Sequence, residues 1–344
     1  MERNKEYLKK LLETPSPSGM EGPAVDVFDS EMSKGKDNLQ LFRDKMNNSA
    51  WFISEISENS RPSLLLSGHI DSICGLITRI SKETGLISVM SGGGWDKKVL
   101  QGTRVSILGD KVIPGVVEKK PLHLERHDDP SEIKWENIKI NTGYTHDQLE
   151  ELGVHVGSRV IYERGNSDLE FGKDGSYIVS PDLDDKIAVY IITEVAKQIS
   201  PSKEKMIAVA AISQEETGLR GAGVCASRIN PDISIDLDVT FAENDDTCSE
   251  VKLGSGPVID FGPDKNVDLS NDLIRVAKEN GIPYQLEASR AGGTNTHAIQ
   301  VRSKDVVTAH IGIPLKNMHT PVEMVSWSDV DNCISLLVQY LKST

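Results

Sequence analysis

The sequence predicts an α/β fold with a mostly parallel, mixed sheet, helices on both faces, and a small β-barrel-like domain inserted into it. Two observations indicate this. Apolar strand-like runs alternate with helical segments towards both ends of the chain, as in sheets covered on both faces. Residues 73–163 instead carry many short β-like runs and almost no helical periodicity. We therefore expect a discontinuous α/β domain over residues 1–72 and 164–344, and an inserted β-domain over residues 73–163.

The N-terminal half begins with helices and continues as strands. Residues 1–12 and 21–33 are helical stretches, separated by the breaker Thr14-Pro15-Ser16-Pro17-Ser18-Gly19. Short apolar strands follow at residues 39–42, 50–56 and 63–66, and the last runs into Gly68-His69-Ile70-Asp71. The inserted segment has strand patterns at residues 75–80, 86–90, 103–108, 112–117 and 159–162.

The alternation of helices and strands returns after Leu183. Ile187, Ile191, Val195 and Ile199 recur every four residues, which predicts an amphipathic helix. A strand at 206–212, a helix at 219–228 and a strand at 233–241 follow. We expect Ser270 to cap a further helix, which Gly281 ends, and the last helix to begin near Ser328.

Composition and charge exclude several classes of protein. The 344 residues are 38% hydrophobic and 26% charged, which is ordinary for a globular protein. The formal net charge of −14 argues against binding to nucleic acid or anionic membranes, because both need basic surfaces. The charged N-terminus has no apolar signal-peptide core, and no segment approaches the roughly 18 to 20 apolar residues of a membrane helix. We therefore expect a cytoplasmic protein.

Acidic and imidazole side chains recur at the ends of apolar strands or just beyond them. In a parallel sheet the carboxyl ends of the strands converge, and ligand sites lie there. Imidazole and carboxylate without thiolate suit an open site for zinc, cobalt or manganese. The candidate residues are His69, Asp71, Asp184, Glu215, Glu216, Asp238 and His319.

Each of these residues also has a structural explanation when it is taken alone. A lone histidine is more often a hydrogen-bonded structural residue, and Asp184 in front of a helix is a common N-cap. The adjacent Glu215 and Glu216 could be a solvated pair. Asp238 is the exception, since a charge inside an apolar strand is costly unless it is paired or bound to metal.

Five blocks occur in order along nearly the whole chain: Ser67-Gly68-His69-Ile70-Asp71, Leu183-Asp184-Asp185-Lys186, Gln214-Glu215-Glu216-Thr217-Gly218-Leu219-Arg220-Gly221-Ala222, Asp238-Val239-Thr240 and Met318-His319-Thr320-Pro321-Val322-Glu323. Together they resemble the signature blocks of the dinuclear-metal aminopeptidases. That family includes the tetrahedral, glutamyl and deblocking aminopeptidases, and its members are sometimes labelled cellulases or endoglucanases. The resemblance implies a fold of the zinc-peptidase type and a metallopeptidase that removes N-terminal residues from short peptides.

The resemblance also implies a role for each candidate residue. His69 and Asp238 would hold one divalent metal ion. Glu216 and His319 would hold the other, and Asp184 would bridge the two. The ions would be zinc in the first instance, with cobalt or manganese as alternatives.

Two further residues complete the implied site. Glu215 would be the general base that takes the proton from the attacking water, which the two ions would activate as hydroxide. Asp71 would hydrogen-bond His69 and orient its ring. The family also implies a cis peptide between Asp184 and Asp185.

Assembly and substrate preference follow less directly. The resemblance implies that the inserted domain mediates dimer contacts and that dimers form a hollow tetrahedral dodecamer admitting only peptides. Asn295 stands where the family usually has an acidic residue. His297 adds an imidazole nearby, either as part of the substrate pocket or as a packing residue.

Three other functions remain open from the sequence. A related dinuclear-metal carboxypeptidase or N-deacylase would use the same core. A glycosidase needs two unligated carboxylates flanking the scissile bond, whereas most acids here would be committed to metal. A catalytically silent assembly or binding protein is the third.

Overall fold

The computed structural model describes residues 3–34, 39–54, 63–121, 123, 133–165, 167–201, 205–242, 250–289 and 293–343. The chain forms two compact units. The first unit comprises Met1–Asp71, Ser167–Met318 and Val322–Thr344, and the second comprises Ser72–Asn166 and His319–Pro321. Residues 1 and 2 of the first predicted helix and residues 55 and 56 of a predicted strand lie outside the described residues.

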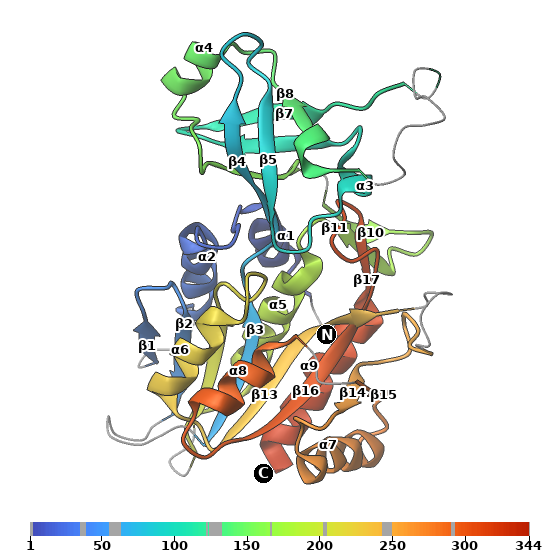
Figure 1. Ribbon diagram of the computed structural model, residues 1–344. Helices are drawn as coiled ribbons and strands as arrows, with labels where there is room; N and C mark the ends of the chain where they lie inside the picture. The colour runs from blue at the N-terminus through green and yellow to red at the C-terminus, as the bar shows by residue number, and fades with distance from the viewer. Residues whose placement is uncertain are drawn as a thin grey trace. The chain divides into compact units, whose positions relative to one another are not determined.

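The first unit is built on a mixed sheet that has eleven strands within the described residues, which confirms the predicted fold class (Figure 1). The central strands β12, β3, β13 and β16 run parallel to one another, so their carboxyl ends lie at one edge. The order is β1 (Gln40–Arg43), β2 (Ser49–Ile53), β12 (Ile207–Ile212), β3 (Leu64–His69), β13 (Ile233–Phe241), β16 (Val307–Lys316), β17 (Glu323–Ser326), β11 (Tyr177–Ser180) and β10 (Asp168–Phe171), with β14 (Val258–Phe261) pairing with β16 and β15 (Gln285–Ala288).

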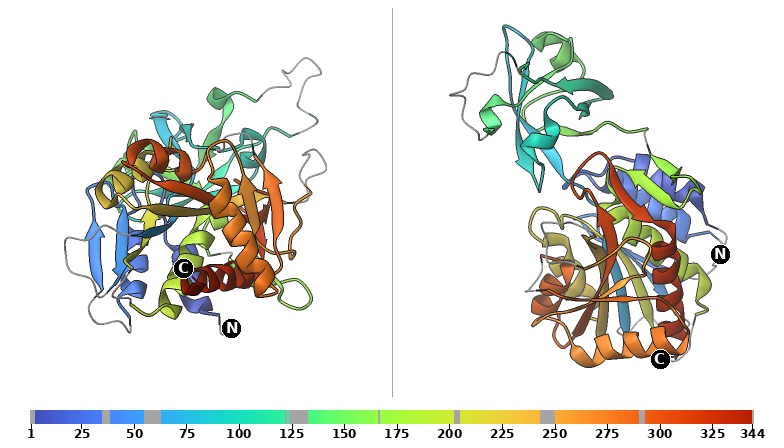
Figure 2. Two further views of the ribbon diagram at one scale, coloured as in Figure 1. Left: turned by 90° about the horizontal axis from the view of Figure 1, so that it is seen from below. Right: turned by 90° about the vertical axis from the view of Figure 1, so that its right-hand side faces the viewer.

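Helices cover both faces of this sheet (Figure 2). Alternate residues of β3 enter different cores: Leu66 packs in the cluster that contains Ile187, and Leu65 packs in the cluster that contains Ala222. The first face carries α5 (Leu183–Gln198) and α9 (Trp327–Ser343), with α1 (Lys5–Glu13) and α2 (Gly22–Met32) on α5 and α7 (Val267–Glu279) on α9. The second face carries α6 (Arg220–Ile229) and α8 (Asn295–Arg302).

Helix α5 is buried on every side, which differs from the amphipathic helix that the spacing predicts. All residues from 183 to 196 are buried, because the sheet covers one side of the helix and α1, α2 and α9 cover the others. The helix follows Asp182, whose φ of 62° is left-handed, and it is kinked at Asp184 and Asp185. The peptide between these two residues is cis, as predicted.

Close packing between β3 and α5 makes Gly68 sensitive to substitution. A Cβ on Gly68 would lie 2.7 Å from the Cβ of Ala188 and 3.2 Å from Oδ2 of Asp185. Both neighbours are buried and cannot move aside. We expect Gly68→Ala to destabilise the protein by about 2 kcal/mol, as overpacked cores do, measured by urea unfolding. Gly22→Ala is the control, because its Cβ would meet the Arg43 guanidinium at 3.9 Å, an ordinary van der Waals contact; equal stability of the two variants would contradict this prediction.

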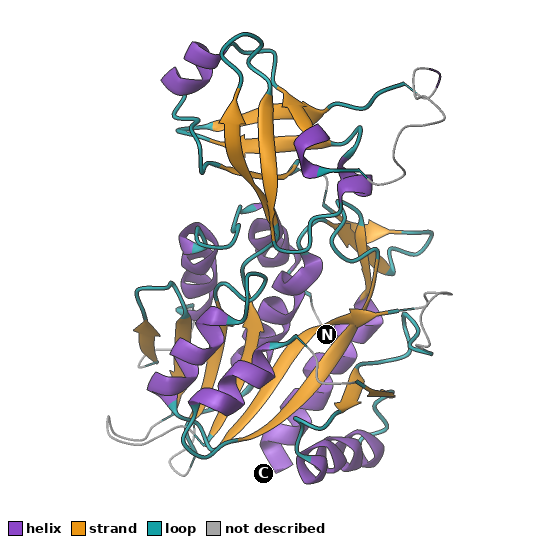
Figure 3. Cartoon of the chain, in the orientation of Figure 1, coloured by secondary structure: helices purple, strands orange, loops and turns teal. Residues whose placement is uncertain are grey.

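The second unit contains a closed barrel, in which the described residues form six strands with antiparallel neighbours (Figure 3). Closure leaves no unpaired strand edge. Ile77, Ile107 and Ile140 belong to its apolar interior. The strands, in order around the barrel, are β4 (Cys74–Ile80), β5 (Ile87–Gly92), β8 (Lys139–Asn141), β7 (Val112–Val117), β6 (Arg104–Leu108) and β9 (Arg159–Tyr162).

Several local features differ from the sequence predictions. The second unit includes the short helices α3 (Lys97–Leu100), η2 (Trp135–Asn137) and α4 (His146–Glu151); α4 is stabilised by a capping box between Thr145 and Gln148. Helix α7 is capped by Asn266, whose side chain accepts a hydrogen bond from the Leu269 N–H, so Ser270 is not the cap. Strands β8, β10, β11, β14, β15, β16 and β17 and helix α8 were not predicted. None of the helices formed by the described residues combines the length and the apolar character that a membrane-spanning helix needs.

Candidate active site

Polar side chains of the first unit converge where the parallel strands end. His69 is the last residue of β3, Asp238 lies in β13, and Asp184 lies at the kinked start of α5. One nitrogen of His69 and one oxygen from each aspartate lie within 4.8 Å of one another. The structure therefore brings these three predicted ligands together.

The ring of His69 is held in the manner of a metal ligand. Its Nε2 lies 3.1 Å from Oδ1 of Asp184 and 3.8 Å from Oδ1 of Asp238. Its Nδ1 lies 3.0 Å from the backbone oxygen of Asp71. One ring nitrogen thus faces the carboxylates, while a carbonyl fixes the other, which is how ligating histidines are usually oriented.

Asp71 contacts backbone N–H groups as well as the imidazole of His69. Its carboxylate lies 3.6 Å from Nδ1 of His69, farther than its own backbone oxygen. The carboxylate accepts hydrogen bonds from the backbone N–H of Glu215 at 2.8 Å and of Glu216 at 3.3 Å. Asp71 therefore links the end of β3 to the loop that follows β12.

That loop, residues 213–219, is here called the Glu215 loop. It is tightly folded: Gly218 and Leu219 both donate their N–H to the backbone oxygen of Glu215, at 2.9 Å each. Gln214 and Leu219 adopt positive φ values of 53° and 56°, which are uncommon for residues with a side chain and cluster at functional sites. The Glu215 side chain is buried, and its Oε2 lies 3.8 Å from Nε2 of His69.

Asp184 also lies close to Glu216, one of the residues predicted to hold the second ion. Oxygens of the Asp184 and Glu216 carboxylates lie within 4.8 Å of each other. The backbone N–H of Asp184 donates to Oε2 of the buried Glu323 at 3.1 Å. Asp184 is thus near His69 and Asp238 and also near Glu216, the arrangement that a bridging ligand requires.

Electrostatics shows an excess of negative charge at this buried place. Burial raises the pKa of Glu215 to about 8. Burial, together with neighbouring carboxylates, raises the pKa of Asp238 and of Asp185 well above the ordinary value. Burial alone would lower the pKa of His69, but Glu215, Asp184 and Asp71 raise it well above its ordinary value. Divalent cations would relieve this repulsion, so the donor set and its charge both fit metal.

His319 belongs to the second unit, within the segment His319–Pro321. Its backbone oxygen accepts a hydrogen bond from the Tyr162 hydroxyl at 3.2 Å. A Cβ on Gly94 would lie 2.2 Å from its Nδ1. The residues on either side of the segment, Met318 and Val322, belong to the first unit. The role of His319 as a metal ligand stays a prediction.

Several buried polar residues beside these groups were not predicted from the sequence. Asp236 precedes Asp238 by two residues and so faces the same side of β13; it accepts a hydrogen bond from the Ser67 hydroxyl at 2.6 Å. Burial raises the pKa of Asp236 to about 6. The alternation of acids in Ile-Asp-Leu-Asp-Val was the available signal. Ser18 gave no signal of its own, and Glu323 ends one of the five sequence blocks but had no role assigned; their contacts come from distant parts of the chain.

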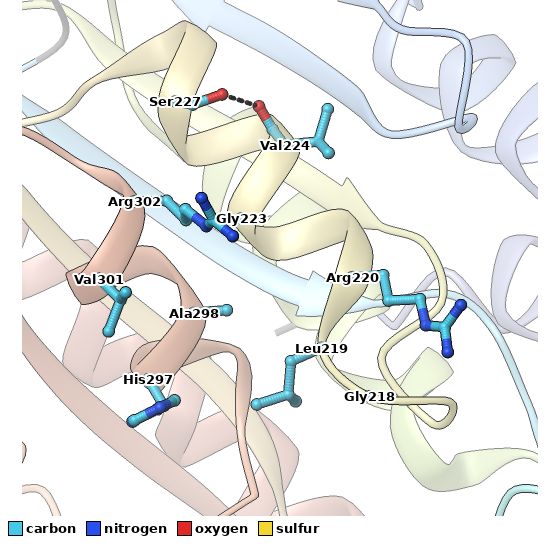
Figure 4. A pocket seen from close by; sticks show the side chains of 10 residues that line it. All are labelled: Gly218, Leu219, Arg220, Gly223, Val224, Ser227, His297, Ala298, Val301 and Arg302. Carbon is cyan, nitrogen blue, oxygen red and sulfur yellow. Dashed lines mark hydrogen bonds between the residues drawn. The ribbon is translucent and has the colours of Figure 1, made fainter.

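A cavity of about 650 Å³ begins at Gly218 in the Glu215 loop and lies between α6 and α8. Its lining includes Leu219, Arg220, His297 and Arg302 (Figure 4). His297 therefore lines a cavity rather than packing inside the unit, whereas Asn295 is fully buried.

The mixed sheet with helices on both faces and the closed barrel agree with the fold that the sequence resemblance implied. Residues 50–336 match the M42 glutamyl aminopeptidase family, and the chain belongs to that family. It is an aminopeptidase by this membership, as the resemblance of its sequence blocks implied.

Individual relatives are similar over almost the full length. The lysyl aminopeptidase of Pyrococcus furiosus is 32% identical over 339 residues, which are 96% of this chain and 94% of the relative. The TET aminopeptidase of Thaumarchaeota archaeon SCGC AB-539-E09 superposes with a TM-score of 0.89 at 28% identity, covering 98% of this chain and 95% of that one. The TET1 peptidase of Pyrococcus horikoshii, which can assemble into a tetrahedron or a large octahedral shell, superposes with a TM-score of 0.83 at 27% identity, covering 97% and 98% of the two chains.

Proposed function

We propose that this aminopeptidase depends on two divalent metal ions and removes N-terminal residues from short peptides. His69 and Asp238 would hold one ion, Glu216 and His319 the other, and Asp184 both. The observation that carries the proposal is the convergence of His69, Asp184 and Asp238 within 4.8 Å at a buried site. Imidazole and carboxylate ligands suit zinc first, and also cobalt or manganese.

Glu215 is the residue that moves protons in this proposal. Bound cations would lower the pKa of water towards about 7 and polarise the scissile carbonyl. The Glu215 carboxylate accepts the proton of the attacking water and delivers it to the leaving amine. The hydrogen bond from the backbone N–H of Glu215 to Asp71 supports the orientation of this residue. Burial excludes bulk water from the carboxylate and raises its pKa to about 8, which favours its use as a proton carrier.

A carboxypeptidase or N-deacylase with the same ligands is the alternative that the test must separate. The protein is stripped of metal, reloaded with zinc, cobalt or manganese, and assayed on aminoacyl fluorogenic substrates and on N-acyl amino acids. We expect hydrolysis of the aminoacyl substrates that depends on the added metal. Faster cleavage of N-acyl amino acids, or full activity without metal, would contradict the proposal.

The second metal position depends on His319. We expect His319→Ala to bind about one ion per chain instead of two, because the remaining ligands of that position, Asp184 and Glu216, are both carboxylates and one of them is shared. Elemental analysis of the zinc-loaded protein measures the stoichiometry. His155→Ala is the control, since His155 is an exposed histidine of the second unit. Two ions retained in His319→Ala would remove this residue from the ligand set.

We also propose that the barrel mediates contacts between copies of the chain, and that dimers form a larger assembly, as large as a tetrahedral dodecamer. The support comes from the barrel surface, where Met90, Val112 and Val116 are 51%, 56% and 48% exposed. The P. horikoshii TET1 peptidase, which is similar in fold, forms such shells. Light scattering of the purified protein gives the mass, and a monomer at micromolar concentration would contradict the proposal.

A further inference from the structure

The turn between α1 and α2 reaches the residues that support the Glu215 loop. The Ser18 hydroxyl donates a hydrogen bond to Oδ2 of Asp71 at 2.5 Å. Both partners are buried, with exposures of 6% for Ser18 and 0% for Asp71. The bond joins a hydroxyl to a carboxyl group, and burial shields it from competition with bulk water.

The turn itself is built to place this hydroxyl. Glu21 is fully buried and accepts a hydrogen bond from the Gly19 N–H at 2.5 Å. Gly19 has a φ of 87°, a conformation that glycine adopts at little cost. The chain therefore closes tightly just after Ser18, so the hydroxyl is fixed by the backbone rather than by its own rotamer alone.

The Asp71 carboxylate distributes its two oxygens between three donors. Oδ1 accepts from the N–H of Glu215, and Oδ2 accepts both from Ser18 and from the N–H of Glu216. The bond to Glu216 is the longest of the three, at 3.3 Å. The hydrogen bond from Ser18 thus restrains Oδ2, the carboxylate oxygen that makes the longer of the two bonds to the Glu215 loop.

We propose that Ser18 is a positioning residue for peptide hydrolysis, acting through Asp71 on the placement of Glu215 and Glu216. This inference rests on the proposed roles of Glu215 as base and Glu216 as metal ligand. Ser18 lies in the turn between α1 and α2, and its hydrogen bond to Oδ2 of Asp71 is the contact through which it would act. Removing the hydroxyl removes this bond, so its effect can be tested by mutation.

Ser18→Ala tests the inference, with Ser16→Ala as the matched control. Ser16 lies in the same turn and is also buried, at 0% exposure, but its hydroxyl has no hydrogen-bond partner within the described part of the chain. We expect Ser18→Ala to lower kcat about tenfold with little change in KM. We also expect it to lower the zinc affinity of the metal-free protein about tenfold, as losing a residue that supports ligands does. Ser16→Ala should match the wild type in both measurements.

A double-mutant cycle separates positioning from a general structural effect. In an Asp71→Asn background, Ser18→Ala should change zinc affinity and kcat less than about twofold, because the two residues act as a pair. Independent, multiplicative effects would overturn the proposal, and so would wild-type kcat and zinc affinity in Ser18→Ala. An equal loss in Ser16→Ala would likewise assign the effect to the turn as a whole. If no variant cleaves peptides but zinc affinity shifts as stated, the proposed function fails and the positioning role of Ser18 stands.

Discussion

Glu215→Gln lowers kcat by roughly 10² to 10⁴, the range that general base catalysis contributes, while the metal content stays at the wild-type value. Glutamine has the same shape, but its amide cannot take up a proton. The replacement leaves the backbone bond from residue 215 to Asp71 intact, so the Glu215 loop and the neighbouring Glu216 keep their positions. Steady-state kinetics on an aminoacyl substrate and elemental analysis of the same sample provide the two measurements.

A control variant must show that replacing another glutamate of the first unit by glutamine does not by itself lower kcat. Glu287→Gln serves this purpose, because Glu287 accepts a hydrogen bond from the Thr240 hydroxyl at 2.8 Å, which a glutamine oxygen also accepts. This variant should retain wild-type kcat. Near-normal turnover in Glu215→Gln would remove Glu215 as the base, and loss of metal from that variant would assign it to the ligands instead.

The metal-free protein loses stability as the pH rises from about 5 to about 8.5. Burial raises the pKa of Glu215 to about 8, so the folded state holds a proton that the unfolded state releases near its ordinary pKa. Such a group contributes stability below the unfolded pKa and loses it as pH rises through the folded pKa. Asp238, Asp185 and His69 have raised pKa values as well, and all four effects have the same sign.

The expected change is large. At about 1.4 kcal/mol for each unit of pKa, Glu215 alone accounts for on the order of 4 kcal/mol across its window. Urea unfolding at pH 5.5, 7.0 and 8.5, with and without bound zinc, gives the free energies of unfolding. Zinc compensates the carboxylate charge, so the loaded protein should show a flatter dependence.

Groups away from the site titrate in the metal-free and in the zinc-loaded protein alike. The difference between their unfolding free energies therefore reports on the site alone. Asp238→Asn removes one of the crowded carboxylates and should flatten the curve of the metal-free protein. Stability of the metal-free protein that stays level or increases with pH would contradict the electrostatic description of the site.

Much of the fold was predictable from local pattern. The apolar run of β12 is uninterrupted, and β3 begins with three leucines. In β13 apolar residues alternate with Ser234, Asp236 and Asp238. These patterns place His69, Glu215 and Asp238 in or near strand ends without knowledge of the structure. Strand β16 escaped prediction because His310, Gly312 and Pro314 interrupt its apolar pattern. The cap of α7 was misassigned because Asn266 and Ser270 are both good caps, and their tertiary surroundings decide between them.

The supporting residues of the site were beyond local reasoning. Ser18 and Asp71 are 53 residues apart, and Asp184 and Glu323 are 139 apart. A serine in a proline-containing turn is ordinary by composition, and only the packing of α1 and α2 against α5 brings it to the carboxylate. Asp238 could be singled out because a charge in an apolar strand is costly. The same reasoning, applied to Asp236, would have found a second buried acid.

The burial of α5 on every side has a thermodynamic consequence for cation uptake. Asp184 lies at the kinked start of this buried helix and is itself 6% exposed. Cations that bind Asp184 only in the folded state, as proposed above, would therefore stabilise the whole unit against unfolding. Amide protons along α5 should accordingly exchange with deuterium only through the global opening reaction, and saturating zinc should slow that exchange throughout the helix rather than at its first turn alone.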